Sequence, residues 1–155
     1  MSVPFLSCMV AAAAFYHLPP RVLPSIHAVE GGKIGMANLN TNGTSDLGLM
    51  QVNTIWVEPL ARYARLSPDV VFTRLRDDAC FNIAAAAAIM RVYLNEANGD
   101  LMTAIGYYHS HTPTRGAAYQ QKVIDAATNL FSRPVDMPAT AKRPAAVKPP
   151  PVAHR

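Results

Sequence analysis

The residue with the clearest chemical potential in this sequence is Glu30. It follows the apolar stretch 22–29 and precedes Gly31 and Gly32, so we expect it at the C-terminal end of a helix. Apolar neighbours and the negative end of the helix dipole both favour the protonated carboxyl, and Lys33 is the only basic residue close in sequence. A carboxyl that stays protonated near neutral pH can serve as the general acid in glycoside cleavage. The alternative is an exposed glutamate at a fraying helix end.

A second segment with chemical potential spans residues 46–53 and reads Asp-Leu-Gly-Leu-Met-Gln-Val-Asn. Gly48 would let a ligand approach the backbone closely, and the amide of Gln51 can both donate and accept hydrogen bonds. This combination suits the binding of an N-acetyl sugar. The alternative is an ordinary junction between a strand and a helix, with Met50 in the core.

A third segment, 104–111, gathers hydroxyl and imidazole groups at an expected junction between a helix and a loop. Tyr108 could orient a catalytic carboxyl through a hydrogen bond. The alternative is one core tyrosine followed by exposed loop histidines, and for His109 and His111 we favour this alternative.

A metal site is a further interpretation of the same side chains. His27 and Glu30 lie one helical turn apart, and His109 and His111 could complete a ligand set. The four residues lack the tight spacing of a multi-ligand metal motif. We therefore expect no metal ligand and no cofactor.

Composition indicates one globular domain followed by a tail. Half of the 155 residues are hydrophobic and 15% are charged, which suits a single domain with a sizeable core. No apolar run reaches the roughly 18 residues that a membrane-spanning helix needs. Residues 1–131 hold nine basic and nine acidic side chains, so the net charge of +4 comes from residues 132–155. A neutral body does not favour a nucleic-acid partner.

Turn and cap signals predict the elements of this domain. The Ser67-Pro68 pair marks a helix start, and Asn42-Gly43 marks a hairpin turn. We expect helices over 7–17, from Pro19-Pro20 to Glu30, from Asn53 through Leu60, from Ser67 through Leu75, over 77–97 as the longest and central helix, over 100–108, and a last one ending at Phe131 after a loop with Pro113 and Gly116. A small β-hairpin should lie within 33–50.

The predicted fold class is therefore α+β and mostly helical. We expect a folded domain over 1–131 and a basic tail over 132–155. The tail holds six prolines and should be disordered or extended.

The first segment and the two cysteines leave alternatives open. Residues 1–16 resemble the apolar core of a signal peptide but lack a basic residue before Arg21, so we expect the first helix of the mature fold and see no evident export signal. Cys8 and Cys80 could form one disulfide in an oxidising compartment or be two separate buried thiols.

Taken together, these motifs resemble a known family. Glu30, an Asn-rich hairpin, Asp46-x-Gly48-Leu49-Met50-Gln51-x-Asn53, Cys80-x-Asn82 and Ala104-x-Gly106-x-Tyr108 follow one another in the order and spacing of the lytic transglycosylase domain of the lysozyme-like superfamily. The resemblance covers about residues 8–131. Within this family, the chain is similar in particular to the small enzymes that accompany type III secretion, type IV secretion and conjugation systems.

The resemblance implies a reaction. Glu30 would protonate the glycosidic oxygen between N-acetylmuramic acid and N-acetylglucosamine in peptidoglycan. It would then act as a base on the C6 hydroxyl, with help from the substrate N-acetyl group, and give a 1,6-anhydro product. The implied setting is the bacterial periplasm, with a monomer acting on glycan strands and the tail contacting the secretion or conjugation machinery.

The resemblance also implies roles for individual residues. Gly48, Leu49, Met50 and Gln51 match the segment that lines the sugar groove, and Tyr108 matches the hydroxyl that holds the catalytic carboxyl. Asn82 matches a structural asparagine at the start of the central helix, and Cys8 and Cys80 match cysteines that pair in the secretion-associated members.

Two positions depart from the family pattern. Gly31 stands where serine is usual, and His109 stands where asparagine usually follows the tyrosine. The polar role of that asparagine would pass to His109, or the contact with the sugar beyond the scissile bond would differ.

Two other functions remain as alternatives. In the first, the protein is a muramidase in which Asp46 activates water as the second carboxylate, as in inverting glycosidases. In the second, it is an assembly factor that binds glycan and acts through its proline-rich tail.

Overall fold

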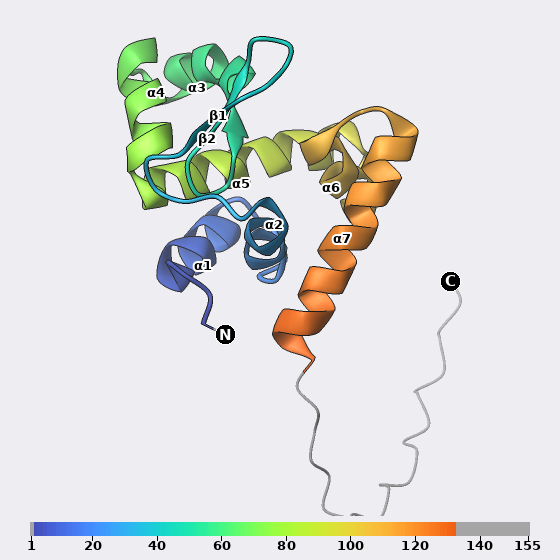
Figure 1. Ribbon diagram of the computed structural model, residues 1–155. Coiled ribbons are helices and arrows are strands. Elements are labelled where there is room, and N and C mark those ends of the chain that lie inside the picture. The colour runs from blue at the N-terminus through green and yellow to red at the C-terminus, as the bar shows by residue number, and fades with distance from the viewer. Residues whose placement is uncertain (1, 133–155) are drawn as a thin grey trace, which may run out of the picture.

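The computed structural model describes residues 2–132 (Figure 1). Its elements, in chain order, are α1 (Leu6–Phe15), α2 (Val22–Glu30), β1 (Ala37–Leu39), β2 (Ser45–Leu47), β3 (Val52–Asn53), the 3-10 helix η1 (Thr54–Trp56), α3 (Val57–Ala64), α4 (Pro68–Asp77), α5 (Ala79–Glu96), α6 (Leu101–His109) and α7 (Pro113–Phe131). The predicted α+β, mostly helical class is confirmed. The predicted disorder of the tail falls on residues 133–155, outside the described part of the chain.

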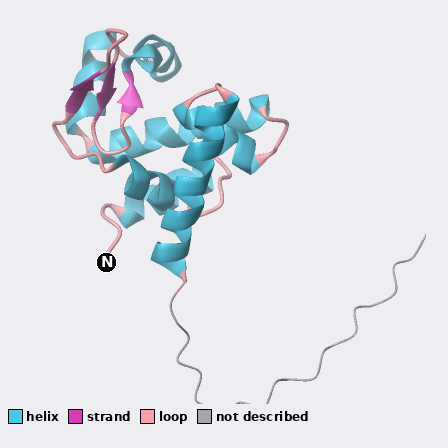
Figure 2. Cartoon of the chain, turned by 45° about the vertical axis from the view of Figure 1, so that its right-hand side comes forward, coloured by secondary structure: helices cyan, strands magenta, loops and turns pink. Residues whose placement is uncertain are grey.

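Helix α5 is the axis of the fold. In Figure 1 it crosses the molecule, with the strands, α3 and α4 on one side and α1 and α2 on the other. Helices α6 and α7 pack together at the C-terminal end of α5, and α7 also packs on α2. Figure 2 shows the strands at the end of the molecule away from the C-terminus of α7. Within residues 2–132, no helix has both the length and the apolar character needed to cross a bilayer.

The sheet is larger than the predicted hairpin, because a third strand joins it. Strand β2 pairs antiparallel with β1 and also with β3. The pairing places Asp46 opposite Asn38 on one side and opposite Asn53 on the other. The β1–β2 turn contains Asn42 and Gly43, as expected, and Gly43 adopts a positive φ of 84°.

The helix boundaries follow the cap signals in most places. Ser67 caps the N-terminus of α4, where its hydroxyl accepts a hydrogen bond from the backbone N–H of Val70 at 3.3 Å. The prediction for α7 was wrong in two respects. Pro113 and Gly116 lie inside this helix rather than in a loop, and its 19 residues make it longer than α5 with 18. A proline at the first helical position costs no hydrogen bond, so Pro113 begins the helix.

Gly106 and Gly116 let α6 and α7 cross closely. A Cβ atom on Gly106 would lie 3.4 Å from the Cα atom of Gly116 and 3.0 Å from the amide nitrogen of Gln120. Larger side chains would force the two helices apart. The position of α7 relative to the rest of the domain therefore depends on this pair.

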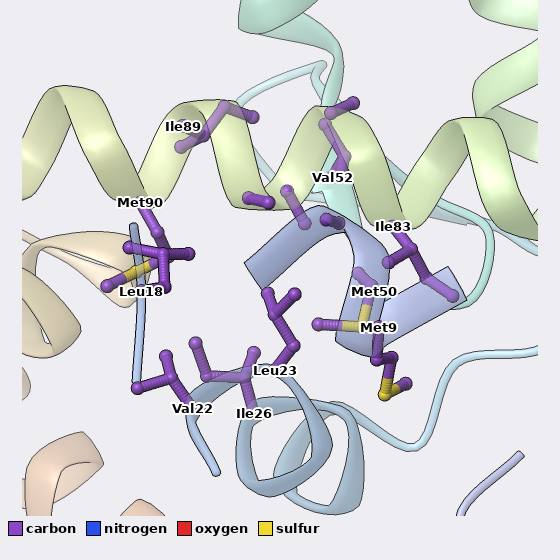
Figure 3. Close-up of a cluster of buried hydrophobic side chains, with 14 of the residues drawn as sticks. Met9, Leu18, Val22, Leu23, Ile26, Met50, Val52, Ile83, Ile89 and Met90 are labelled. Atoms are coloured by element: carbon purple, nitrogen blue, oxygen red, sulfur yellow. The ribbon is translucent and has the colours of Figure 1, made fainter. Parts of the chain in front are cut away.

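The core lies between α5, the N-terminal helices and the turn that joins β2 to β3. Figure 3 shows Met9, Leu23 and Ile26 facing Met50 and Ile83 across this space. All five side chains are almost completely buried. Burial of such side chains contributes about 1.5–3 kcal/mol each, so this cluster dominates the stability of the domain.

A disulfide joins Cys8 in α1 to Cys80 in α5, which confirms the pairing implied by the family resemblance. The two residues are 72 positions apart in sequence. In the chain-entropy model a loop of this length stabilises the fold by about 4 kcal/mol. The disulfide also attaches α1 covalently to α5, so that α1 is part of the folded domain, as expected.

Asn82 connects three segments through one buried side chain. Its amide nitrogen donates to the carbonyl oxygens of Leu47 and Leu75, each at 2.8 Å, and its amide oxygen accepts from the backbone N–H of Met50 at 2.8 Å. The side chain is fully buried. Asn82 therefore ties β2, the end of α4 and the turn before β3 to the start of α5.

We predict that Asn82→Ala lowers the free energy of unfolding by about 3–5 kcal/mol, because three buried backbone groups lose their partner. Urea denaturation under non-reducing conditions measures the change. Asn95→Ala, on the exposed side of the same helix, is the matched control and should cost less than about 0.5 kcal/mol. Similar losses for the two variants would contradict the role given to Asn82.

Candidate active site

Glu30 is the last residue of α2, as expected from the two glycines that follow it. Gly31 adopts a left-handed conformation with φ of 63°, and its N–H donates to the carbonyl oxygen of His27 at 2.8 Å. A Cβ atom on Gly31 would meet no other atom within 4 Å, so backbone conformation, not space, favours glycine there. Gly32 has no such room, because a Cβ would collide with the carbonyl oxygens of Gly48 and Leu49.

The carboxyl of Glu30 has one direct partner, the hydroxyl of Tyr119 in α7. This hydroxyl donates to Oε1 of Glu30 at 2.7 Å. No local sequence signal points to Tyr119, which lies 89 residues from Glu30. Its spacing from the buried Gly116 and Val123 places it on the inner face of α7, but that pattern does not identify the partner across the helix interface.

Opposing effects set the protonation of Glu30. Burial raises the pKa of its carboxyl above the ordinary value, and the negative charge of Asp46 raises it further. The hydrogen bond from Tyr119 and the positive charge of Lys122 lower the same pKa. Burial is the largest of these effects, so the pKa is raised overall.

Glu30 lines a cavity of about 540 Å³ between the sheet, α5 and the α6–α7 junction. This volume is within the range of ligand pockets, which is about 300–1,000 Å³. Its lining combines polar groups with aromatic rings. The lining includes Glu30, Asp46, Gln51, Asn53, Trp56, Tyr93, Tyr107, Tyr108, His109, His111 and Arg115.

One wall of the cavity is a chain of ring contacts. Trp56 and Tyr93 meet edge to face with centroids 5.7 Å apart, and Tyr93 contacts Tyr107 at 6.2 Å. Tyr107 stacks on His111 at 4.1 Å, and Nε2 of His111 lies 2.8 Å from Oε1 of Glu96. His111 lies in the loop after α6 and is exposed, as expected, and its ring also forms part of this wall. Aromatic faces of this kind commonly line ligand pockets.

Gln51 faces the cavity, whereas the three residues before it do not. Leu49 and Met50 are buried in the core. Gly48 adopts a positive φ of 67°, and a Cβ atom there would collide with the carbonyl oxygen of Leu75. Residues 48–50, expected to line the sugar groove, do not line this cavity. These three residues position Gln51 at the cavity. The side-chain oxygen of Gln51 accepts a hydrogen bond from the Asn38 amide at 2.6 Å, and its side-chain nitrogen donates to the Gly48 carbonyl oxygen at 2.8 Å.

Tyr108 also lies beside the cavity, but it does not hold Glu30. Its hydroxyl donates to the carbonyl oxygen of Met50 at 2.8 Å. Burial, followed by the charge of Glu30, raises its pKa well above the ordinary value. The hydrogen bond to the carboxyl comes from Tyr119 instead, because α7 packs on α2.

The two remaining polar candidates also line the cavity. Asp46 accepts a hydrogen bond from the side chain of Asn53 at 2.9 Å. His109 is exposed, as expected, but it is the last residue of α6 and not a loop residue, and its ring stacks on Tyr119 with centroids 4.9 Å apart.

The proposed metal ligands do not converge. His27 contacts the carbonyl oxygen of Gly32 through Nε2 at 3.2 Å, and His111 is paired with Glu96. Among residues 2–132, no group of three or more His, Cys, Asp or Glu side chains is arranged to hold a metal ion.

Comparison with known proteins agrees with this geometry. A model of the Transglycosylase SLT domain family matches residues 7–131, which include every helix from α2 to α7 and all three strands. Comparison with individual curated proteins gives no match. Because the matched region covers most of the chain and contains Glu30, Tyr119 and the whole cavity, the chain belongs to the Transglycosylase SLT domain family.

Proposed function

We propose that the protein is a peptidoglycan lytic transglycosylase and that Glu30 is both its acid and its base. The observation that carries this proposal is the Glu30–Tyr119 pair at the edge of a cavity rich in polar and aromatic groups. A partly buried carboxyl with a raised pKa can donate a proton near neutral pH. The family match supports peptidoglycan as the substrate.

In the first step, Glu30 gives its proton to the glycosidic oxygen between N-acetylmuramic acid and N-acetylglucosamine. The bond from this oxygen to the anomeric carbon breaks, and the leaving sugar departs as an alcohol. The carbonyl oxygen of the substrate N-acetyl group stabilises the anomeric carbon. Glu30 is then a carboxylate, which the Tyr119 hydroxyl and the charge of Lys122 stabilise.

In the second step, the carboxylate of Glu30 takes the proton of the C6 hydroxyl on the muramoyl sugar. The C6 oxygen attacks the anomeric carbon and closes the 1,6-anhydro ring. Glu30 ends the cycle protonated, so no water is consumed. Both protonation states are needed, which agrees with a carboxyl on which burial and hydrogen bonding act in opposite directions.

A hydrolase is the second candidate, because Asp46 lines the same cavity and its charge acts on Glu30. In that reaction Asp46 would activate a water on the opposite face of the sugar. One of its oxygens accepts a hydrogen bond from Asn53, which fits a role in holding the sheet together. We therefore favour transglycosylation.

We predict that the purified protein releases 1,6-anhydro muropeptides and that Glu30→Gln lowers the rate by about 10²–10⁴-fold, as expected for loss of a positioned general acid. Glutamine keeps an oxygen that can accept from Tyr119, so thermal unfolding should change little. Mass spectrometry of the released muropeptides measures both rate and product. Reducing ends from the unaltered protein, together with loss of activity in Asp46→Asn, would identify a hydrolase instead.

The pH dependence of activity should report on the same carboxyl. Activity falls as the pH rises through the pKa of Glu30, because the acid must be protonated. Tyr119→Phe removes a hydrogen bond that lowers this pKa, so the alkaline limb of kcat/KM should move to higher pH. Tyr63→Phe, on an exposed tyrosine outside the cavity, is the matched control and should leave the limb in place. A shift to lower pH in Tyr119→Phe would contradict the assignment.

We further propose that the enzyme acts in the periplasm and opens the wall locally for a secretion or conjugation apparatus. The Cys8–Cys80 disulfide supports an oxidising compartment. The pairing occurs at the positions where the motifs resemble secretion-associated members of the family. The basic, proline-rich segment 132–155 suits docking to an acidic or aromatic surface.

This role makes a prediction for a bacterial strain that carries the gene. Deletion should reduce secretion or conjugation, and Glu30→Gln should fail to restore it although the protein accumulates normally. Transfer assays with immunoblots measure both properties. Full restoration by Glu30→Gln would show that the protein acts as an assembly factor and not through catalysis.

A further inference from the structure

The ring of His109 lies against the ring of Tyr119 at the edge of the cavity. The two rings are stacked with centroids 4.9 Å apart and planes 7° apart. Glu30 and His109 both line the cavity, whereas Tyr119 does not, although its hydroxyl reaches Glu30. His109 thus covers the face of Tyr119 that would otherwise meet the water of the cavity.

From this arrangement we infer that His109 is a positioning residue, whose ring keeps water away from the Tyr119–Glu30 pair and holds the tyrosine against the carboxyl. His109 does not need to touch the reacting atoms for this role. It acts through Tyr119, which is only 4% exposed. The inference rests on the proposed function for its catalytic consequence, but the protection of Glu30 from water can be measured without activity.

The surroundings of His109 favour the neutral form of its ring. Burial lowers the pKa of His109, and the positive charges of Lys122 and Arg115 in α7 lower it further, while Asp46 in β2 raises it. A neutral imidazole adds no positive charge beside Glu30. An imidazolium there would stabilise the carboxylate and weaken the acid.

Removal of the ring should have a distinct electrostatic signature. Burial is the largest effect that raises the pKa of Glu30, so water admitted by His109→Ala should lower that pKa. Tyr119→Phe acts in the opposite direction, because it removes a hydrogen bond that stabilises the carboxylate. The two substitutions on the two stacked rings therefore shift one carboxyl in opposite directions, which a general loss of structure would not do.

The test is the pKa of Glu30 in the full-length chain labelled with ¹³C at the glutamate carboxyls. Only three glutamates, Glu30, Glu58 and Glu96, give signals, and Glu30→Gln identifies the first. We expect a lower pKa in His109→Ala. In His109→Phe, which keeps a flat ring and never carries a charge, we expect the wild-type value or a higher one. Circular dichroism confirms that each variant is folded.

Activity adds a second readout. In His109→Ala the alkaline limb of kcat/KM should move to lower pH, and kcat near neutral pH should fall roughly tenfold, a part of what a positioned acid contributes. An unchanged or raised pKa of Glu30 in His109→Ala, or a lowered one in His109→Phe, overturns the inference. If the pKa values behave as expected but the wild-type protein releases no muropeptides, the proposed function fails and the role of His109 stands.

Discussion

The hydrogen bond between Glu30 and Tyr119 is the interaction on which the candidate site depends. It joins the end of α2 to the middle of α7, two helices far apart in sequence. Gly31 ends α2 at the carboxyl, and the close crossing of α6 and α7 at Gly106 and Gly116 places the hydroxyl. A change in either place would separate the pair without altering the residues themselves.

The surroundings of this pair serve two needs at once. A general acid must hold its proton at neutral pH, and the carboxylate left after proton transfer must remain stable enough to act as a base. Burial and Asp46 favour the first form, whereas Tyr119 and Lys122 favour the second. Met50 links the cleft to the core, because its N–H donates to Asn82 and its carbonyl oxygen accepts from Tyr108.

Signals that act within a few residues were sufficient to predict much of the fold. Asn42-Gly43 marked the turn, and Ser67-Pro68 marked the start of a helix, because caps and turns are local hydrogen-bonding events. Strand β3 was missed because two residues carry no periodicity, and it forms only by pairing with β2.

Glu30 could be found from its neighbours, but Tyr119 could not, because contact between distant helices leaves no local pattern. Tyr108 carries a hydroxyl and lies beside the cavity, as a partner of Glu30 would. Only the packing shows that this hydroxyl donates to the Met50 carbonyl oxygen instead.

Helix α7 is the last element of the domain, and it supplies the hydroxyl that completes the pair. The Glu30–Tyr119 pair therefore forms only when α7 has packed on α2. Local opening of α7 would expose the Glu30 carboxyl to water and remove its hydrogen-bond donor, even where the rest of the domain kept its structure.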